Sequence, residues 1–446
     1  MNKPIVGKYK EYVYDNTEPP ANGFYNKYIE IQIRNRNKVL SDNGFYLHMG
    51  NGDVDRKEFP IPACLTDTLV RSLNAQYYRY SHPLGRPTTR QVIAEYENFI
   101  AKKNIYTTNN VGMVLSATGG FSSAIEILMR HNKFKGHGLI TQPTFPVYEA
   151  VLWKRFGIHK VVGEKSNGFL PTIDEVIKNT NNQTRFIILT SPSFPFGKFY
   201  SKKDLEKIVD FANDTKTYVI LDELFYDLPF REVSNIGSVD KNQDFIVRIK
   251  GFSKDRAVPG FRAGYVLASE PFMMELNKYA NHCYGLPPSL FEPFVEKDLI
   301  MRMLMKGKTK IDSVNIHDLP QVAEIKSAII GDCKKDLPAY KKNIQGTLEK
   351  YKENRDFILN SVKSIARMET IEPDAGFNMG VRIDHSGNSF EFFKKMFFET
   401  GVILAPGEVF DMPKSAGNWF RLTFSNNKEQ MAEALGRIKK YLGNAN

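Results

Sequence analysis

Residues 186–222 read FIILTSPSFPFGKFYSKKDLEKIVDFANDTKTYVILD. The apolar run FIIL at 186–189 predicts a buried strand, and KKDLEKIVDFAND at 202–214 predicts a helix. The run YVIL at 218–221 predicts the next strand. Strands that alternate with helices form β-α-β units, whose strands lie parallel in one sheet. This stretch therefore predicts an α/β fold.

The same alternation extends from about residue 77 to residue 290. Val114-Leu115 predicts a strand, followed by a glycine-rich turn and the helix-forming stretch SSAIEILMRH. Further strands are predicted at 138–140 and 245–247, with a helix near 147–156. We expect one mostly parallel sheet. Ligands bind at the carboxyl ends of strands in such sheets, so the residues just after each strand are the candidates for chemistry.

Changes in character along the chain divide it into four segments. Residues 1–76 are expected to form an N-terminal arm and part of a small domain, and 77–290 a large domain. Residues 291–345 are helical and charge-rich, so we expect a helical junction or an insertion there. Residues 346–446 combine a long polar helix, short strands and a closing helix. This α+β pattern predicts a smaller C-terminal domain.

The composition is that of a globular protein. The 446 residues are 42% hydrophobic and 25% charged, and no apolar run approaches the ~18 residues that a membrane-spanning helix needs. The net charge of +11 favours anionic partners. The basic residues are scattered along the chain, however, so nucleic-acid binding is not expected.

The cysteines and histidines indicate neither a disulfide framework nor a metal site. Cys64, Cys283 and Cys333 are far apart and form no CxxC pair, and the eight histidines include no HExxH motif. The N-terminal stretch MNKPIVGKYKEYVYD lacks the apolar core of a signal peptide. We therefore expect a cytoplasmic protein without a metal ion.

Three stretches carry residues that could perform chemistry. In SATGGFSSAIEI (116–127), a glycine pair enters a helix, where backbone N–H groups can bind an anion; the alternative is an ordinary turn. Asp222 directly follows a predicted strand, so it either belongs to a helix cap or turn, or is a carboxylate that pairs with a cationic ring nitrogen or acts as a base. Lys254 lies eight positions before Arg262. It is either solvated or held where it can form a Schiff base, and Arg262 could bind a phosphate.

From about residue 45 to its end, the chain resembles the class I/II aminotransferases, which use pyridoxal phosphate. The most specific match is SK-x5-G-x-R-x-GY at Ser253–Tyr265. The other matching motifs, in chain order, are PTFPVY (143–148), TSPSFPFGKFYSKKDLEKI (190–208), ILDELFYD (220–227), PG-x2-F (406–410) and WFRLTFS (419–425). The resemblance implies the fold of aspartate aminotransferase, fold type I, with a seven-stranded sheet in the large domain.

The resemblance also implies roles for residues that bind the cofactor. Lys254 would hold pyridoxal phosphate as an internal aldimine and move the substrate's α-proton. Asp222 would keep the ring nitrogen protonated. The phosphate would be bound by a further set of residues, namely Gly120, Phe121, Ser122, Ser253 and Arg262.

Four more residues match positions that contact the ring, the substrate or a second subunit. Phe145 would stack on the cofactor ring, and Arg421 would bind the α-carboxylate of the substrate through two hydrogen bonds. Gly50 lies where the family contacts the substrate. Tyr80, in YSHPLG, matches the tyrosine that reaches the phosphate of a neighbouring subunit, so a homodimer is expected.

The chain departs from the family at three positions. Phe194 replaces the usual Asn and Phe225 the usual Tyr that donate to the cofactor's phenolic oxygen. Ser193 or Tyr226 could take over as the donor, and we count Tyr226 among the cofactor-binding candidates. Gly251 stands where many members have a phosphate-binding Ser.

The function that we expect is amino-group transfer from an amino acid to a 2-keto acid. The altered phenolic-oxygen site leaves one alternative open, a pyridoxal-phosphate-dependent lyase, cyclase or oxidase on the same fold. A regulator with an aminotransferase-like domain has less support, because no helix-turn-helix domain is attached. The sequence does not identify the amino acid.

Overall fold

The large domain is built on a seven-stranded sheet. The computed structural model describes residues 20–133, 135–152, 156–241, 243–309 and 320–444. The strands of this sheet are β2 (Val111–Leu115), β3 (His137–Gln142), β4 (Gly157–Val162), β5 (Thr184–Thr190), β6 (Tyr218–Asp222), β7 (Ile246–Gly251) and β8 (Ala263–Leu267), in the order β2-β8-β7-β6-β5-β3-β4. Only β8 runs antiparallel to its neighbours in this sheet. The α/β fold with a mostly parallel sheet is therefore confirmed.

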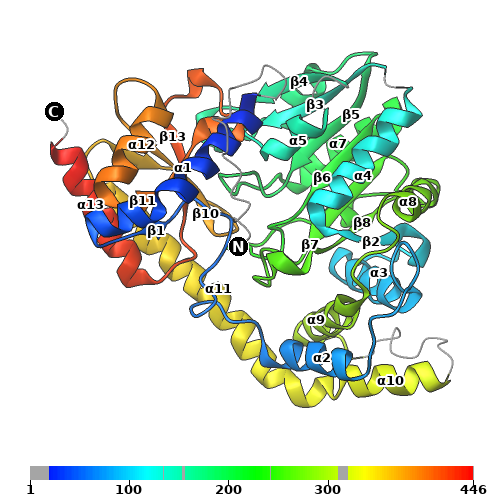
Figure 1. Cartoon of the computed structure of the whole chain (residues 1–446). Helices are drawn as coiled ribbons and strands as arrows, with labels where there is room; N and C mark the ends of the chain where they lie inside the picture. The colour runs from blue at the N-terminus through cyan, green and yellow to red at the C-terminus, as the bar shows by residue number, and fades with distance from the viewer. Residues whose placement is uncertain (1–19, 134, 153–155, 242, 310–319, 445–446) are drawn as a thin grey trace, which may run out of the picture.

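Helices cover both faces of the large sheet (Figure 1). The helices of the described residues are α1 (Pro20–Asn43), α2 (Ala63–Asn74), α3 (Pro87–Ala101), α4 (Ser116–His131), α5 (Pro146–Leu152), α6 (Ile173–Lys178), α7 (Lys202–Thr215), α8 (Glu270–Cys283), α9 (Glu292–Met305), α10 (Pro320–Ile330), α11 (Cys333–Lys363), α12 (Ser389–Thr400) and α13 (Lys428–Asn444). One apolar core packs α4, α5 and α8 on the sheet, and another packs α6 and α7 on the opposite face.

The helix α7 shows how local sequence sets these elements. Ser201 accepts a hydrogen bond from the amide of Asp204, whose side chain accepts one from the Ser201 amide in return. The buried residues of the helix, such as Leu205, Ile208 and Val209, follow helical spacing and face the sheet. The stretch quoted at the start thus forms strand, helix and strand as predicted.

The glycine-rich turn expected before α4 is wrong, because the helix begins at Ser116 and includes both glycines. A Cβ atom on Gly120 would lie 3.0 Å from Cγ2 of Val114 and 3.0 Å from Cγ2 of Val266. The glycine therefore lets the helix pack close to the sheet. The sequence pattern alone cannot distinguish this packing role from a turn.

The small domain contains a four-stranded antiparallel sheet. Its strands are β9 (Met368–Thr370), β10 (Asn378–Ile383), β12 (Ala405–Pro406) and β13 (Trp419–Thr423), in the order β12-β13-β10-β9. A separate parallel pair joins β1 (Leu47–His48) to β11 (Val402–Ile403). This pair places the N-terminal arm beside the C-terminal segment. The helix α1 packs against both α5 of the large domain and α12 of the small domain.

The described residues of the segment 291–345, namely 291–309 and 320–345, contain α9, α10 and the first part of α11. The expected boundary at 345 falls inside α11, which runs along both domains (Figure 1). The helix α9 packs against α2, α3 and α11. Its charged residues Glu296, Lys297 and Asp298 are almost fully buried. The charge-rich sequence of α9 therefore belongs to the interior of the protein and is not a solvated surface.

Within the described residues, no helix combines the length and the apolar character that crossing a membrane requires. The same residues contain no group of side chains suited to hold a metal ion. The three cysteines are free.

Two glycine substitutions test the packing of α4. Gly120→Val should lower the free energy of unfolding by about 2 kcal/mol, because stiff neighbouring valines leave no room for the added methyl groups. Gly436→Ala is the control, since a Cβ atom at this exposed position in α13 meets nothing within 4 Å. It should stabilise the protein by about 0.5–1 kcal/mol. Urea unfolding measures both values. A stable Gly120→Val variant would contradict the packing role.

Candidate active site

A cavity of about 390 Å³ lies where the large sheet, the small domain and α1 meet. Thr190 and Asp222, which are paired at the carboxyl ends of β5 and β6, form part of its wall. The small domain contributes Phe410 and Arg421, and α1 contributes Tyr25. The cavity is thus at the edge of the sheet where the sequence predicted the chemistry.

Lys254 reaches the cavity from the loop after β7. Its Nζ donates a hydrogen bond to the carbonyl oxygen of Gly52 at 2.5 Å. Burial lowers the pKa of Lys254 to about 8, and the nearby positive charge of Arg421 adds to this effect. A substantial fraction of Lys254 is therefore neutral near pH 7–8, and the neutral amine is the form that attacks a carbonyl carbon.

The carboxyl group of Asp222 lies on the cavity wall at the end of β6. Its Oδ1 accepts a hydrogen bond from the amide of Leu224 at 2.8 Å, and its Oδ2 accepts one from the hydroxyl of Tyr148. Burial raises the pKa of Asp222, although both hydrogen bonds act in the opposite direction. A cation in the cavity would stabilise this carboxylate.

Arg262 and the first turn of α4 form a cationic corner of the cavity. The Arg262 guanidinium donates to Ser116 Oγ at 2.6 Å and to the carbonyl oxygen of Pro259 at 2.7 Å. Ser116, Ala117 and Thr118 begin α4 and lie on the cavity wall. The first amides of a helix have no partner within it, so this corner is suited to bind an anion. Ser253 also lines the cavity.

Two of the three residues of α4 that were predicted to bind the phosphate do not line the cavity. Gly120 is packed against the sheet, and neither it nor Ser122 is part of the cavity wall, whereas Phe121 is. This follows from the early start of α4, which brings Ser116, Ala117 and Thr118 to the cavity instead.

Arg421 is buried between two aromatic rings. Its guanidinium carbon lies 4.6 Å from the ring centre of Phe410 and 5.3 Å from that of Phe194. One of its nitrogens donates to the carbonyl oxygen of Gly50, and its Nε has no hydrogen-bond partner. Burial lowers the pKa of Arg421 to about 10. A buried cation with a free donor is well suited to bind a carboxylate.

The two phenylalanines that depart from the family both lie on the cavity wall. The rings of Phe194 and Phe225 are 6.2 Å apart and nearly parallel, at 18°. Ser193 and Tyr226, the alternative donors, are not part of this wall. Ser193 accepts a hydrogen bond from the amide of Lys198 within its own loop. The ring of Tyr226 packs 4.8 Å from the Nζ of Lys250.

The remaining predicted residues lie at different places. Phe145 lines the cavity, with its ring edge-on to Phe194 at 6.1 Å. Gly50 lies next to the cavity through its contact with Arg421, whereas Gly52 lines it directly. Tyr80 is 94% exposed and is not part of the cavity wall.

Sequence reasoning missed two tyrosines. Tyr148, which supports Asp222, stands in the motif PTFPVY and could have been found there. Tyr25 is on α1, outside every motif that matched the family, and no feature of the sequence indicated that it lines the cavity.

The groups around the cavity fit pyridoxal phosphate. Arg262 and the start of α4 suit its phosphate, and Asp222 suits a protonated ring nitrogen. Lys254, the only lysine on the wall among the described residues, suits its aldehyde.

The model of the aminotransferase class I and II family matches residues 45–438. The chain belongs to this family. The protein is therefore an aminotransferase that depends on pyridoxal phosphate, and these predictions are confirmed. The comparisons give no support to the lyase, cyclase or oxidase alternative.

Named relatives agree with this assignment. Aspartate aminotransferase of Thermotoga maritima is 24% identical over 392 residues, which cover 86% of this chain and 89% of the relative. A putative aminotransferase of Bacillus subtilis is 26% identical over 403 residues, covering 89% and 91%.

Solved structures show the same fold. The crystal structure of the Thermotoga maritima aspartate aminotransferase has a TM-score of 0.72 at 23% identity and covers 93% of this chain and 97% of its own. The aromatic aminotransferase of Pyrococcus horikoshii has a TM-score of 0.74 at 22% identity and covers 92% and 98%.

Chemical trapping tests the position of Lys254. Borohydride reduction of the aminotransferase with its cofactor, followed by peptide mapping, should place the pyridoxyl mass on Lys254, because its amine is both cavity-facing and partly neutral. Lys250 is an internal control, since it is buried in ion pairs with Glu97 and Asp227. Label on Lys250 or on any lysine other than Lys254 would contradict the assignment.

Proposed function

We propose that this aminotransferase moves an amino group between an amino acid and a 2-keto acid in the cavity lined by Lys254, Asp222, Arg262 and Arg421. The observation that supports this most strongly is the convergence of these four side chains on one cavity from three separate segments, namely the end of β6, the connection between β7 and β8, and β13. When bound, pyridoxal phosphate supplies an aldehyde that links to amines and a ring that accepts electron density.

Lys254 is proposed to hold the cofactor and to move the proton. Its neutral amine, favoured by burial and by Arg421, would hold the aldehyde of the cofactor through a C=N bond, with release of water. Released from that bond by the amine of the substrate, Lys254 Nζ would be free to take the α-proton of the amino acid and to give it back. A general base works best when its pKa lies near the working pH, and the pKa of about 8 meets that condition.

Asp222 is proposed to hold a proton on the ring nitrogen of the cofactor. The hydroxyl of Tyr148 and the amide of Leu224 fix its carboxylate in place. A positive ring nitrogen next to this buried carboxylate would favour its ionised form. The ion pair keeps the ring able to accept electrons during proton transfer.

Arg421 is proposed to bind the α-carboxylate of the amino acid. It is the guanidinium of the small domain that faces the cavity, and its Nε is buried without a partner. Its contact with the carbonyl oxygen of Gly50 would give way to a carboxylate, which is the stronger acceptor for a charged donor.

The side chain of the preferred amino acid is proposed to be apolar. Tyr25, Val147 and Phe410 line the cavity, and the ring of Phe410 packs against Arg421. Beyond Lys254, Asp222, Arg262 and Arg421, the wall has one further charged residue among those described, Asp53, which is an acid paired with Arg56. Such a wall disfavours a second carboxylate on the substrate.

We propose a homodimer as the active form. Tyr80 is almost fully exposed, and Val70 and Leu73 on α2 expose half of their surface nearby in the sequence. These exposed apolar and aromatic groups support contact with a second copy.

The free cysteines are compatible with a reducing compartment such as the cytoplasm.

Single-turnover measurements test the proposed reaction. Mixed with phenylalanine, the enzyme with its cofactor should convert to the amino form of the cofactor, and phenylpyruvate should return it. The value of kcat/KM for phenylalanine should exceed that for aspartate by about 10-fold or more, since burying an unpaired carboxylate is costly.

Arg421→Lys provides the control for this comparison. Both amino acids should lose binding to a similar extent, because both carry the α-carboxylate and lysine lacks the planar fork of arginine. A preference for aspartate would contradict the apolar pocket. A failure of every 2-keto acid to reverse the conversion would contradict the amino-transfer cycle.

Restoring one donor tests the effect of the aromatic wall. Phe225→Tyr adds a hydroxyl that can donate a hydrogen bond to the cofactor's phenolic oxygen. Because this bond stabilises the negative charge of the oxygen, the oxygen attracts the proton on the Lys254 nitrogen less strongly. The pH midpoint of the absorbance change should therefore fall by roughly one to two units, the equivalent of a hydrogen bond to a charged group. Phe225→Leu, without a donor, should leave the midpoint near that of the wild type. An equal shift in both variants would show that the donor is not the cause.

A further inference from the structure

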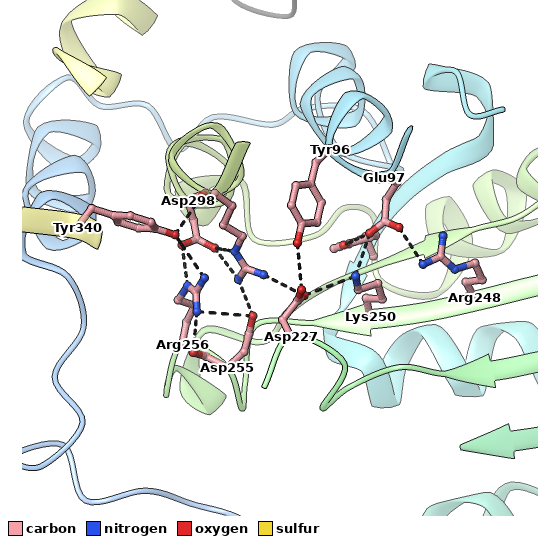
Figure 2. A network of polar contacts seen from close by, with 11 residues as sticks. Tyr96, Glu97, Asp227, Arg248, Lys250, Asp255, Arg256, Asp298 and Tyr340 are labelled. Carbon is pink, nitrogen blue, oxygen red and sulfur yellow. Dashed lines mark hydrogen bonds and ion pairs between the residues drawn. The ribbon is translucent and has the colours of Figure 1, made fainter. Parts of the chain in front are cut away.

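A network of buried charged side chains includes the two residues that follow Lys254 in the chain (Figure 2). It includes residues of α3, β7, the loop after β6 and the loop that carries Lys254, and it reaches α9 and α11. Its acidic members are Glu97, Glu223, Asp227, Asp255 and Asp298, and its basic members are Arg248, Lys250, Arg256 and Arg302. Most of these side chains are almost completely removed from solvent.

The two residues after Lys254 belong to this network. Asp255 forms an ion pair with Arg302 at 2.5 Å, and Arg256 Nε forms one with Asp298 at 2.6 Å. Lys254 itself lines the cavity and contacts Gly52. Consecutive side chains of the loop therefore point to opposite sides, one to the cavity and two into the network.

Residues of α9 and Tyr340 of α11 form the other side of the contact with the loop that carries Lys254. Asp298 also accepts a hydrogen bond from Arg302 Nε at 2.8 Å and one from the hydroxyl of Tyr340 at 2.7 Å. The same hydroxyl accepts a hydrogen bond from Arg256 at 3.3 Å. The Tyr340 hydroxyl thus bridges the two members of the ion pair between the loop and α9.

The backbone of the loop is weakly held by its own hydrogen bonds. Two of its backbone bonds, from Phe252 N to Ala263 O and from Ala257 N to Lys254 O, are long, at 3.3 and 3.4 Å. Ala257 has a φ of +55°, which is unfavourable for a residue with a Cβ atom. Such a conformation persists only where the surrounding contacts impose it.

We propose that Asp298, Arg302 and Tyr340 are positioning residues that hold the loop of Lys254 and thereby set the place of its amine in the cavity. The inference rests on the proposed role of Lys254. Buried ion pairs contribute little net stability, because the cost of desolvating the charges offsets their attraction. The network would then serve mainly to orient the loop.

The least disruptive test is Tyr340→Phe, which removes only the bridging hydroxyl. The matched control is Tyr265→Phe. It removes an equally buried hydroxyl whose hydrogen bond, at 2.7 Å, goes to Glu97 on α3 and not to the Arg256–Asp298 pair. Arg302→Lys, which keeps the charge but loses the planar fork, is the stronger second variant. All variants are compared as enzymes loaded with cofactor. Each is assayed at the same number of degrees below its own melting temperature.

In Tyr340→Phe, kcat should fall by about 10-fold with KM for the amino acid within about 2-fold, because Arg421 is not on this loop. The visible circular dichroism of the bound cofactor and the pH midpoint of its absorbance should also change. Arg302→Lys should show the same changes to a larger extent. Tyr265→Phe should lose similar stability while the dichroism, the pH midpoint and kcat stay as in the wild type.

Two results would overturn the proposal. One is wild-type dichroism and pH midpoint in both Tyr340→Phe and Arg302→Lys. The other is the same change in Tyr265→Phe as in Tyr340→Phe, which would indicate general destabilisation. Borohydride trapping of the wild type separates these outcomes from a failure of the proposed function. Label on Lys254 leaves that function standing, whereas label elsewhere removes the basis of both.

Discussion

The segment from Met49 to Gly52 binds both key cations of the active site through its carbonyl oxygens. Gly50 O accepts a hydrogen bond from Arg421 of the small domain, and Gly52 O accepts one from Lys254 of the large domain. The carbonyl oxygens of Met49 and Asn51 each accept a hydrogen bond from Thr423 on β13. These two bonds attach the segment to the small-domain sheet. A Cβ atom on Gly50 would lie 2.6 Å from the amide nitrogen of Ala405, so only glycine allows this approach. This short segment brings the amine of one domain and the guanidinium of the other to one cavity.

Much of the fold was predictable because strands and helices have local signals. The stretch 186–222 gave strand, helix and strand, and Asp222 was placed correctly at a strand end. The start of α4 was not predictable, because a glycine pair fits both a turn and a close contact between helix and sheet. Only the neighbouring Val114 and Val266 decide between the two. The helix begins at Ser116, six residues before the predicted stretch SSAIEILMRH (122–131), and this changes which amides face the phosphate corner.

Long-range contacts determine the parts of the active site that could not be predicted from the sequence. The charged residues of α9 suggest a solvated helix when read alone, yet Asp298 has partners in the loop of Lys254 and on α11. Tyr25 reaches the cavity because α1 packs on both domains, which no local pattern encodes. The replacement of two polar donors by Phe194 and Phe225 was visible in the sequence. Their position on the cavity wall required the fold.

A crystal structure of the enzyme with pyridoxal phosphate and an unreactive amino-acid analogue is the most direct test of how the two domains share this cavity. The account predicts a covalent bond from Lys254 to the cofactor, Asp222 within hydrogen-bond distance of the ring nitrogen, and Arg421 on the carboxylate of the analogue. It also predicts the phosphate at Arg262 and the first turn of α4, with the apolar faces of Phe194 and Phe225 beside the phenolic oxygen. A cofactor bound through another lysine, or a carboxylate held away from Arg421, would contradict it.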